Sequence, residues 1–339
     1  MIIKDAIECF YRRVDLSHDD MTTLMRAIMS GEVPPVSMAA FLVGIQVKGP
    51  TVEEVAAAAA VMREFSTTVL VDRPERLIDT CGTGGDGTKT FNISTASAFV
   101  VAAAGGAVAK HGGRSVSSSS GSADVLEALG ARLDLPSESV TSCIEEVGIG
   151  FMFAPAHHAA MKFAAPVRRE LGVKTLFNVL GPLTNPAGAK RQVMGVFDRR
   201  LLVQQAQVLQ RLGSTRAMIV HGENGLDEMS PSGLTHVAEL RDDEVREYQV
   251  SLEALGVTPI NLDDIKVADL GSAVRVFRGA LSGAHRSGKT AVVLNAAASF
   301  YTLGMVENLD GGLALAATTI ESGGAEEKLN EFIAFTRRD

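Results

Sequence analysis

The chain has 339 residues, of which 46% are hydrophobic and 21% are charged. These fractions match ordinary globular proteins and exclude a wholly disordered chain. The 40 acidic residues outnumber the 32 Lys and Arg residues, giving a formal net charge of −8. A generally basic protein that binds polyanions is therefore excluded, although a local basic patch is not. Aromatic residues make up 5% and Trp is absent, which disfavours a surface that stacks nucleic-acid bases.

The three cysteines, Cys9, Cys81 and Cys143, show no CxxC spacing. This usage fits a reducing cytoplasm and disfavours a zinc site. The N-terminus lacks the apolar region of a secretory signal. The longest bland stretch, residues 96–109, is shorter than the roughly 20 apolar residues that span a membrane. We therefore expect a soluble, cytoplasmic protein with no membrane partner.

Residues 1–70 are predicted to form short helices. Apolar residues recur at helical spacing after a candidate cap at Ser17. Thr51 with Glu54 forms a capping box at the start of another helix. Glycine and proline residues separate these segments, so this region is predicted to be a small helical domain.

After residue 73 the pattern alternates between strands and helices. Strands are expected at 77–81, 107–112, 148–154, 191–197 and 216–222, with helices at 94–104, 122–130 and 199–212 and a helical tail from about 270. Such alternation predicts an α/β domain with a parallel sheet. Ligands of such sheets bind at the carboxyl ends of the strands.

The strongest local signal is CGTGGDGTKTFNIST, residues 81–95, which follows the first strand. Its glycines bring backbone N–H groups close to a ligand, and the next helix, which Ser94 could cap, favours anions at its N-terminus. A tight turn is the alternative, but four glycines in six residues favour a phosphate-binding loop. The loop also matches GxGxxG. However, no acidic residue lies between Asp86 and Asp124, so a dinucleotide site is disfavoured.

Two further segments carry charge suited to a polyphosphate. KHGGRSVSSSSGSAD, residues 110–124, combines Lys110 and Arg114 with hydroxyl groups, which can bind phosphate, although such a run can also be a solvated loop. The adjacent Asp227 and Glu228 follow another strand. Paired carboxylates suit Mg²⁺, whereas a solvated acidic surface is the alternative.

Residues 151–172 and 283–290 contain two weaker signals. Arg168 is a candidate partner for a carboxylate, because a guanidinium group pairs with it bidentately. His157 and His158 are expected to cap or pack rather than catalyse. Residues 283–290 match the Walker A pattern, but the preceding run is not a convincing strand, so a P-loop is disfavoured.

Together these segments closely resemble the anthranilate phosphoribosyltransferase family, nearly end to end. The matching motifs are GTGGD (82–86), FNIST (91–95), GSADVLEALG (121–130), LFNVLGPLTNP (176–186) and HGENGLDE (221–228). The resemblance implies a homodimer. Each subunit would have a small all-helical N-terminal domain and a larger domain with a mainly parallel sheet flanked by helices, with the active site between them.

The resemblance also implies boundaries and a reaction. The helical domain would span residues 1–73 and about 168–188, and the α/β domain residues 74–167 and 189–339. The reaction would transfer the phosphoribosyl group of 5-phosphoribosyl 1-diphosphate (PRPP) to anthranilate, releasing diphosphate, with two Mg²⁺ ions per active site. We assign no general base, because the aromatic amine needs little deprotonation before it attacks.

The implied site residues fall on matching positions of this chain. PRPP would be bound by Gly82, Gly85, Asp86, Thr90, Asn92, Ile93, Ser94, Thr95, Lys110, His111, Gly112, Gly113, Arg114, Ser115, Val116, Ser117, Ser118 and Ser122. Mg²⁺ would be bound by Ser94, Asp227 and Glu228, and anthranilate by Gly82, Gly113 and Arg168.

The chain departs from the family pattern at two positions. Gly113 replaces an Asn that helps to hold anthranilate, and Lys174 stands where the family prefers Arg. The first departure leaves open a related transferase or phosphorylase that uses another aromatic base. A nucleic-acid-binding paralogue and a P-loop nucleotidase stay open as well. The acidic balance and the retained Ser94, Lys110 and acidic pair argue against the paralogue.

Overall fold

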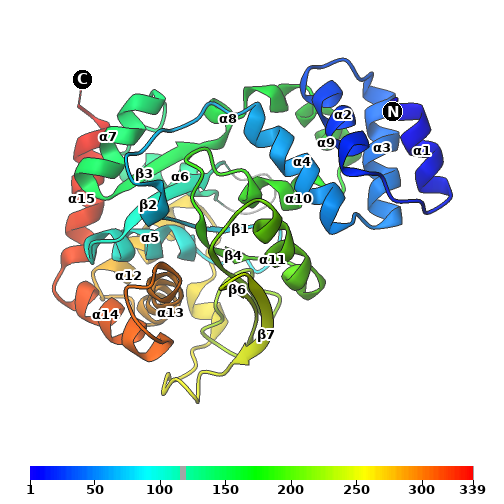
Figure 1. Ribbon diagram of the computed structural model, residues 1–339. Coiled ribbons are helices and arrows are strands. Elements are labelled where there is room, and N and C mark those ends of the chain that lie inside the picture. Colours follow the sequence, from blue (N-terminus) through cyan, green and yellow to red (C-terminus); the bar gives the residue numbers. More distant parts are fainter. Residues whose placement is uncertain (115–119, 339) are drawn as a thin grey trace.

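The computed structural model describes residues 1–114 and 120–338. The chain forms a bundle of N-terminal helices beside a larger α/β body (Figure 1). This architecture confirms the predicted fold class. Of the residues expected in the site, Ser115, Val116, Ser117 and Ser118 lie outside the described part of the chain.

The N-terminal bundle contains α1 (Ile3–Tyr11), α2 (His18–Met29), α3 (Pro35–Lys48) and α4 (Val52–Glu64). Both predicted caps are present. The Ser17 hydroxyl accepts a hydrogen bond from Asp20 N at 3.1 Å, and the Thr51 hydroxyl accepts one from Glu54 N at 3.2 Å. Each cap satisfies an N–H group that the first turn leaves unpaired.

One sheet forms the centre of the α/β body. Within the described chain it has seven strands in the order β3-β2-β1-β4-β5-β6-β7. They are β1 (Leu77–Gly82), β2 (Ala107–Gly112), β3 (Ile149–Phe153), β4 (Arg191–Gly195), β5 (Arg216–Gly222), β6 (Thr235–Arg241) and β7 (Glu244–Val250). The first five are parallel, as expected. The antiparallel hairpin β6–β7 was not anticipated from the sequence.

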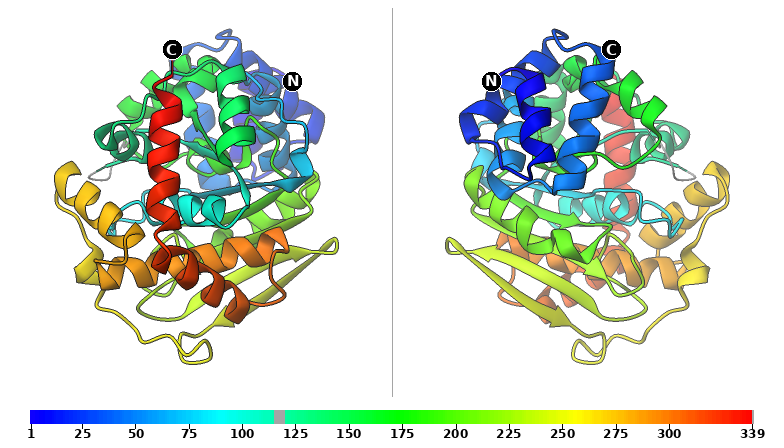
Figure 2. Two further views of the ribbon diagram at one scale, coloured as in Figure 1. Left: turned by 90° about the vertical axis from the view of Figure 1, so that its left-hand side faces the viewer. Right: turned by 90° about the vertical axis from the view of Figure 1, so that its right-hand side faces the viewer.

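Helices cover both faces of this sheet (Figure 2). The longer ones are α5 (Ile93–Ala103), α6 (Ser122–Leu129), α7 (Ser137–Val147), α11 (Leu202–Arg211), α12 (Leu270–Leu281), α13 (Arg286–Leu303), α14 (Leu309–Glu321) and α15 (Gly324–Thr336). Helices α5, α13 and α15 contribute to the core on one face, and α11 to the core on the other. The helical tail after residue 270 is therefore confirmed.

Short helices complete the chain. They are η1 (Pro74–Arg76), α8 (Ala154–His157), η2 (Ala159–Lys162), α9 (Ala165–Leu171), α10 (Phe177–Leu180), η3 (Gly181–Leu183), η4 (Arg199–Leu201) and η5 (Leu262–Ile265). No helix in the described residues is long and apolar enough to cross a membrane.

A middle segment of the chain packs against the N-terminal bundle. Helix α9 contacts α3, and α10 contacts α4. Val167, Phe177 and Leu180 belong to the same hydrophobic core as the first four helices. These contacts support the expected return of the chain to the helical domain. The precise limits, 1–73 with 168–188 against 74–167 with 189–339, stay a prediction.

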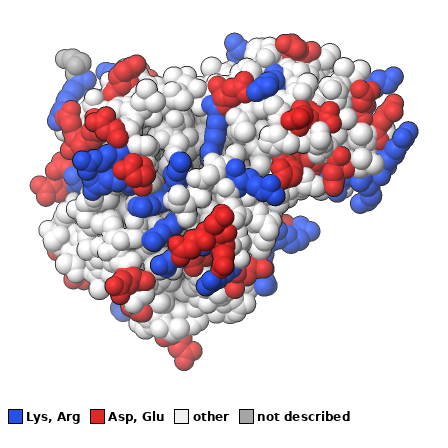
Figure 3. All heavy atoms as spheres, viewed as in Figure 1, with Lys and Arg blue, Asp and Glu red and all other residues white. Residues whose placement is uncertain are grey.

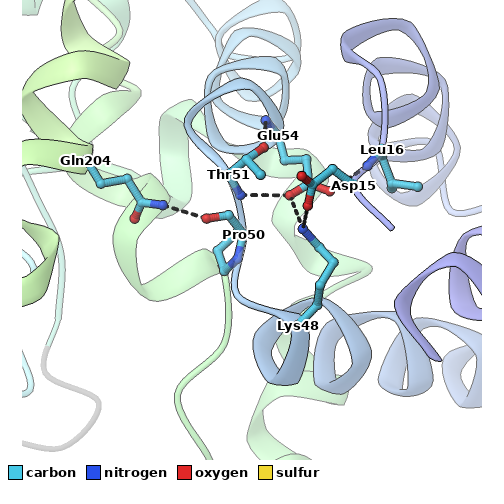
Figure 4. Close-up of polar contacts among 7 residues, drawn as sticks. All are labelled: Asp15, Leu16, Lys48, Pro50, Thr51, Glu54 and Gln204. Atoms are coloured by element: carbon cyan, nitrogen blue, oxygen red, sulfur yellow. Dashed lines mark hydrogen bonds and ion pairs between the residues drawn. The ribbon is translucent and has the colours of Figure 1, made fainter. Parts of the chain in front are cut away.

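A buried ion pair shapes the turn between α3 and α4 (Figure 4). The Glu54 carboxylate is fully buried and accepts from Lys48 Nζ, Thr51 N and Leu16 N, each at 2.8 Å. Because both carboxylate oxygens have donors, the buried charge is compensated. From α11, Gln204 Nε2 donates to Pro50 O at 2.6 Å. This contact joins the bundle to the α/β body.

Acidic and basic side chains are interspersed on the face of the molecule that Figure 3 shows, with uncharged surface between them.

Candidate active site

The glycine loop leaves the carboxyl end of β1, which lies between β2 and β4 in the sheet. Gly84, Gly85 and Gly87 have φ angles of +67°, +70° and +76°. Side chains with a Cβ rarely adopt this left-handed region, so the backbone path requires glycine. A loop with this path exposes backbone N–H groups at the edge of the sheet where ligands of α/β proteins bind.

A second loop crosses the ends of β1 and β4. A Cβ on Gly82 would lie 2.4 Å from Asp227 Oδ2, and one on Gly195 would lie 1.4 Å from Asp227 O. Only glycine permits this approach at both strand ends. Gly195 was not among the residues expected in the site. The signal that could have identified it is a glycine at the end of a parallel strand beside β1.

The acidic pair contacts both the glycine loop and α5. Asp227 Oδ2 accepts a hydrogen bond from Gly84 N at 2.7 Å, and Glu228 Oε1 accepts one from Ser94 N at 3.0 Å. Asp227 N lies 3.4 Å from Asp86 Oδ2, to which it donates. The structure therefore brings Asp86 and Ser94 together with Asp227 and Glu228, which lie far from them in the sequence.

The carboxylates of this pair are less solvated than a surface loop would suggest. Glu228 is only 9% exposed. Burial, with the nearby charge of Asp86, raises the pKa of Asp227 to about 7. Burial, with the charge of Asp227, raises the pKa of Glu228 to about 8. The alternative of a solvated acidic surface is therefore disfavoured, because the loop folds back over the strand ends.

This cluster fits a divalent cation, whose charge would offset the burial and the repulsion that raise both pKa values. Among the described residues, no group of three or more His, Cys, Asp or Glu side chains is arranged to hold a metal ion alone. Mg²⁺ is typically bound by one or two carboxylates with substrate phosphates and water. The geometry therefore fits an ion shared between Asp227, Glu228 and a phosphorylated ligand.

Without metal, the stability of the protein is expected to fall as the pH rises between about 5 and about 8. In this range the folded chain keeps protons on Asp227 and Glu228. The unfolded chain does not, since its carboxyl pKa values are near 4. Stability falls with pH wherever the folded state binds more protons. Thermal unfolding in a chelator, measured across this pH range for the parent and for the double variant Asp227→Asn/Glu228→Gln, tests the expected pH dependence. Parallel pH profiles would contradict the raised pKa values.

The start of α5 differs from the prediction in one detail. The helix begins at Ile93 with Asn92 at the N-cap, so Ser94 lies in the first turn and does not cap the helix. Its N–H group is used by Glu228 instead. Asn92 Nδ2 donates to Ser120 O at 3.2 Å and so connects α5 to the loop before α6. Thr90, Ile93 and Thr95 lie beside these residues in the chain.

The two basic candidates at the end of β2, Lys110 and Arg114, have different surroundings. Lys110 is 3% exposed, and its Nζ donates to Thr80 O on the neighbouring strand. Arg114 points to α6, where it pairs with Glu127 at 2.5 Å and Asp124 at 3.2 Å. The charge of Lys110 thus lies against β1, the strand that leads into the glycine loop, whereas that of Arg114 is compensated by α6.

The loop between β2 and α6 also has backbone contacts. Gly113 O accepts from Ala123 N at 3.1 Å and from Ser122 Oγ at 3.4 Å. His111 N donates to Asp79 Oδ1 at 3.2 Å, and Gly112 is the last residue of β2. Asp79 is fully buried, and burial raises its pKa. Asp79 was not singled out from the sequence as a partner of the β2 end, because this residue lies inside an apolar strand.

Arg168 lies on α9, with its guanidinium carbon 5.4 Å from the centroid of the Phe177 ring. Burial lowers the pKa of this arginine. Among the described residues, no hydrogen bond joins it directly to the glycine loop. His157 Nδ1 lies 2.8 Å from Thr67 O, and the rings of His111 and His158 pack with centroids 5.0 Å apart. These contacts agree with the capping or packing role expected of His157 and His158.

The Walker A match at residues 283–290 is not a P-loop. It follows helix α12 rather than a strand and leads into α13. Lys289 forms an ion pair with Glu321 at 2.8 Å. His285 Nδ1 accepts from Gly288 N at 3.0 Å and caps the helix. The structure therefore removes the P-loop nucleotidase from the alternatives.

The two domains of the fold match two family models of one class of enzyme. Residues 4–66 match the helical bundle domain of the glycosyl transferase family, and residues 74–326 match the a/b domain of that family. The chain is therefore a glycosyltransferase with both domains of the family.

Individual relatives narrow the class. An anthranilate phosphoribosyltransferase from Thioalkalivibrio sulfidiphilus is 53% identical over 336 residues, which cover 99% of each chain. The crystal structure of the enzyme of this name from Thermus thermophilus matches with a TM-score of 0.93 at 43% identity, over 98% of this chain and 100% of that one. The structure of the Saccharomyces cerevisiae enzyme of the same name, in complex with PRPP and Mg, matches with a TM-score of 0.90 at 26% identity. The match covers 98% of this chain and 97% of the yeast chain. The chain belongs to the anthranilate phosphoribosyltransferase family.

Proposed function

We propose that this chain transfers the phosphoribosyl group of PRPP to anthranilate, giving N-(5-phosphoribosyl)anthranilate and diphosphate in tryptophan biosynthesis. The observation that carries the proposal is the meeting of the glycine loop with Asp227 and Glu228 at the end of β1. Protein mixed with Mg²⁺, PRPP and anthranilate should consume the fluorescence of anthranilate. Folded protein that leaves this fluorescence unchanged would contradict the proposal.

The proposed PRPP site uses the glycine loop, the start of α5 and the loop after β2. Its described members are Gly82, Gly85, Asp86, Thr90, Asn92, Ile93, Ser94, Thr95, Lys110, His111, Gly112, Gly113, Arg114 and Ser122. Ser94, Asp227 and Glu228 would hold Mg²⁺, two ions per active site, which would neutralise charge on the diphosphate. Binding stoichiometry in the presence of PRPP tests the number of ions.

The chemistry follows from where charge develops. The amine of anthranilate attacks C1 of the ribose while the bond from C1 to the diphosphate oxygen breaks. Negative charge then grows on the leaving group. Backbone N–H groups of the glycine loop and the charge of Lys110 would stabilise it, which is electrostatic preorganisation. Arg168 would bind the anthranilate carboxylate and so orient the amine toward C1.

Gly113 tests the specificity for anthranilate. Among the described residues, a Cβ at this position would meet only Ala154 Cβ, at an ordinary 3.7 Å, and the φ angle is not in the left-handed region. Gly113→Asn should therefore fold and add a side-chain amide. The KM for anthranilate is expected to fall by up to about tenfold, for one hydrogen bond near 1 kcal/mol with some loop ordering. The KM for PRPP should be nearly unchanged.

The contrary outcome for Gly113→Asn has a specific meaning. If the variant binds anthranilate no better while PRPP binding is retained, a simple missing contact is the wrong explanation. A different aromatic base would then become the better substrate, and the same assay with other aromatic amines would identify it.

We also propose a homodimer formed through the N-terminal bundle. Val36, Val43 and Val47 are exposed along one stripe of α3, and Tyr11 of α1 is 83% exposed. Apolar patches of this kind mark interaction surfaces. Val47→Glu is expected to shift the protein toward monomers in sedimentation experiments. Leu70→Glu, at another exposed apolar residue outside the stripe, is the control. Equal behaviour of both variants would contradict this interface.

The three unpaired cysteines agree with the cytoplasmic location that we propose.

A further inference from the structure

Lys174 connects the glycine loop to the segment that follows α9. Its Nζ donates a hydrogen bond to Gly85 O at 2.9 Å. The same Nζ lies 3.4 Å from the centroid of the Phe197 ring. A cation that meets both a carbonyl oxygen and an aromatic face is held by two favourable interactions. The aliphatic stem also approaches the loop, since a Cβ on Gly85 would lie 3.5 Å from Lys174 Cε.

The hydrogen bond to Gly85 O has a consequence for the next peptide group. In a planar trans peptide, the C=O of one residue and the N–H of the following residue point in opposite directions. By holding Gly85 O, Lys174 therefore sets the direction of the Asp86 N–H group. Among the described residues, a Cβ placed on either flanking glycine, Gly84 or Gly87, would meet no atom within 4 Å, so these two positions are not packed against other segments.

Phe197 is itself anchored to the same strand ends. It follows β4, and its N–H donates to Thr83 Oγ1 at 3.0 Å. Thr83 N in turn donates to Gly195 O at 2.9 Å. Lys174 is thus held by the segments that leave two adjacent parallel strands, β1 and β4.

The other side of Lys174 leads to the candidate anthranilate site. Helix α9, which carries Arg168, is followed by Gly172, which has a φ angle of +63°. Thr175 N donates to Asn178 Oδ1 at 2.9 Å just before α10. Lys174 lies in this short connection, so movement of the connection and orientation of the Gly85–Asp86 peptide are mechanically linked.

We propose that Lys174 is a positioning residue for PRPP, because it holds the Gly85–Asp86 peptide group in one orientation and links it to the segment after Arg168. This inference rests on the proposed function of the glycine loop. It requires the positive charge and the reach of the side chain, and not a direct contact with either substrate.

The test compares three variants of the full-length protein. Lys174→Met keeps much of the stem and removes the charge, whereas Lys174→Arg keeps the charge and can stack on Phe197. Lys328→Met removes an equal charge from α15, where Lys328 pairs with Glu331. Steady-state kinetics give KM for each substrate, and calorimetry with Mg²⁺ gives the Kd of PRPP. Thermal unfolding checks that the variants are folded.

Lys174→Met should raise the KM and Kd of PRPP by about 5- to 20-fold. This is less than the loss of a charge-assisted hydrogen bond made directly to a ligand, because Lys174 acts on PRPP only through the Asp86 N–H group. The KM for anthranilate should change less than about twofold. Lys174→Arg should restore PRPP binding to within about threefold, and Lys328→Met should match the parent.

Three results would overturn the inference: unchanged PRPP binding in Lys174→Met, no rescue by Arg in a folded variant, or an equal increase of both KM values. Failure of the proposed function is distinguishable. If the parent binds PRPP but does not transfer to anthranilate, the function fails, and the calorimetric comparison still decides the role of Lys174. A parent that binds no PRPP would overturn both.

Discussion

Asp227→Asn combined with Glu228→Gln is expected to abolish most Mg²⁺-dependent turnover while the fold remains. The amide oxygens can still accept from Gly84 N and Ser94 N, which are 2.7 and 3.0 Å from the carboxylates. The variant therefore removes charge with little change of shape. Taking each carboxylate–metal contact as equal to a hydrogen bond to a charged group, about 1.5–3 kcal/mol, losing two should lower kcat/KM by roughly 10² to 10⁴.

The measurement is kcat/KM for PRPP against Mg²⁺ concentration, at saturating anthranilate. Glu223→Gln is the matched control, because Glu223 is an exposed carboxylate in the same loop. The control should follow the parent curve, whereas the double variant should stay low even at high Mg²⁺. Parent-like activity of the double variant at limiting Mg²⁺ would remove Asp227 and Glu228 from the metal site.

The same double variant also separates a binding role from a structural one. Because burial and mutual repulsion raise both pKa values, neutral amides should leave the metal-free protein at least as stable as the parent above about pH 7. If the two carboxylates served only to stabilise the fold, the double variant would be less stable than the parent in this pH range. The charge of this pair is thus a cost to the metal-free fold that binding of a cation offsets.

The parts of this protein that could be predicted from sequence are those whose signals are local. The strand 77–81 and the following glycines are adjacent in the chain, so apolar pattern and turn chemistry together predict both. The caps at Ser17 and Thr51 and the helical tail have the same basis. The contact of Asp227 with Gly82 and Gly195 could not be predicted in this way. It joins three separate segments, and glycine leaves no side-chain signal.

The hairpin β6–β7 shows why one element was missed. Its turn residues, Asp242 and Asp243, have φ angles of +52° and +62°. A two-residue turn of this kind normally carries Asn-Gly or Asp-Gly, which is the usual sequence signal for a hairpin. Two aspartates adopt the conformation at some cost and hide that signal. The misplaced cap at Ser94 has a different cause, since its N–H partner, Glu228, is 134 residues away.

Arg168→Ala is expected to raise the KM for anthranilate by roughly 10- to 150-fold, the range for a hydrogen bond to a charged group of about 1.5–3 kcal/mol. The KM for PRPP should change far less. The structure supplies the reason for this selectivity. The Arg168 guanidinium packs over the Phe177 ring, and within the described residues it makes no hydrogen bond to the glycine loop, so its donors are available to a carboxylate.

Arg169→Ala is the matched control, because Arg169 is the next residue on α9 and is exposed. It removes the same charge from the same helix and should leave both KM values near those of the parent. Arg168→Lys should recover only part of the affinity, since an ammonium group cannot form the bidentate contact of a guanidinium group. Equal increases of the two KM values in Arg168→Ala would instead place this arginine on the phosphate side or in a structural role. Anthranilate would then need another partner for its carboxylate, and the packing of α9 against the bundle would be the reason for retaining Arg168.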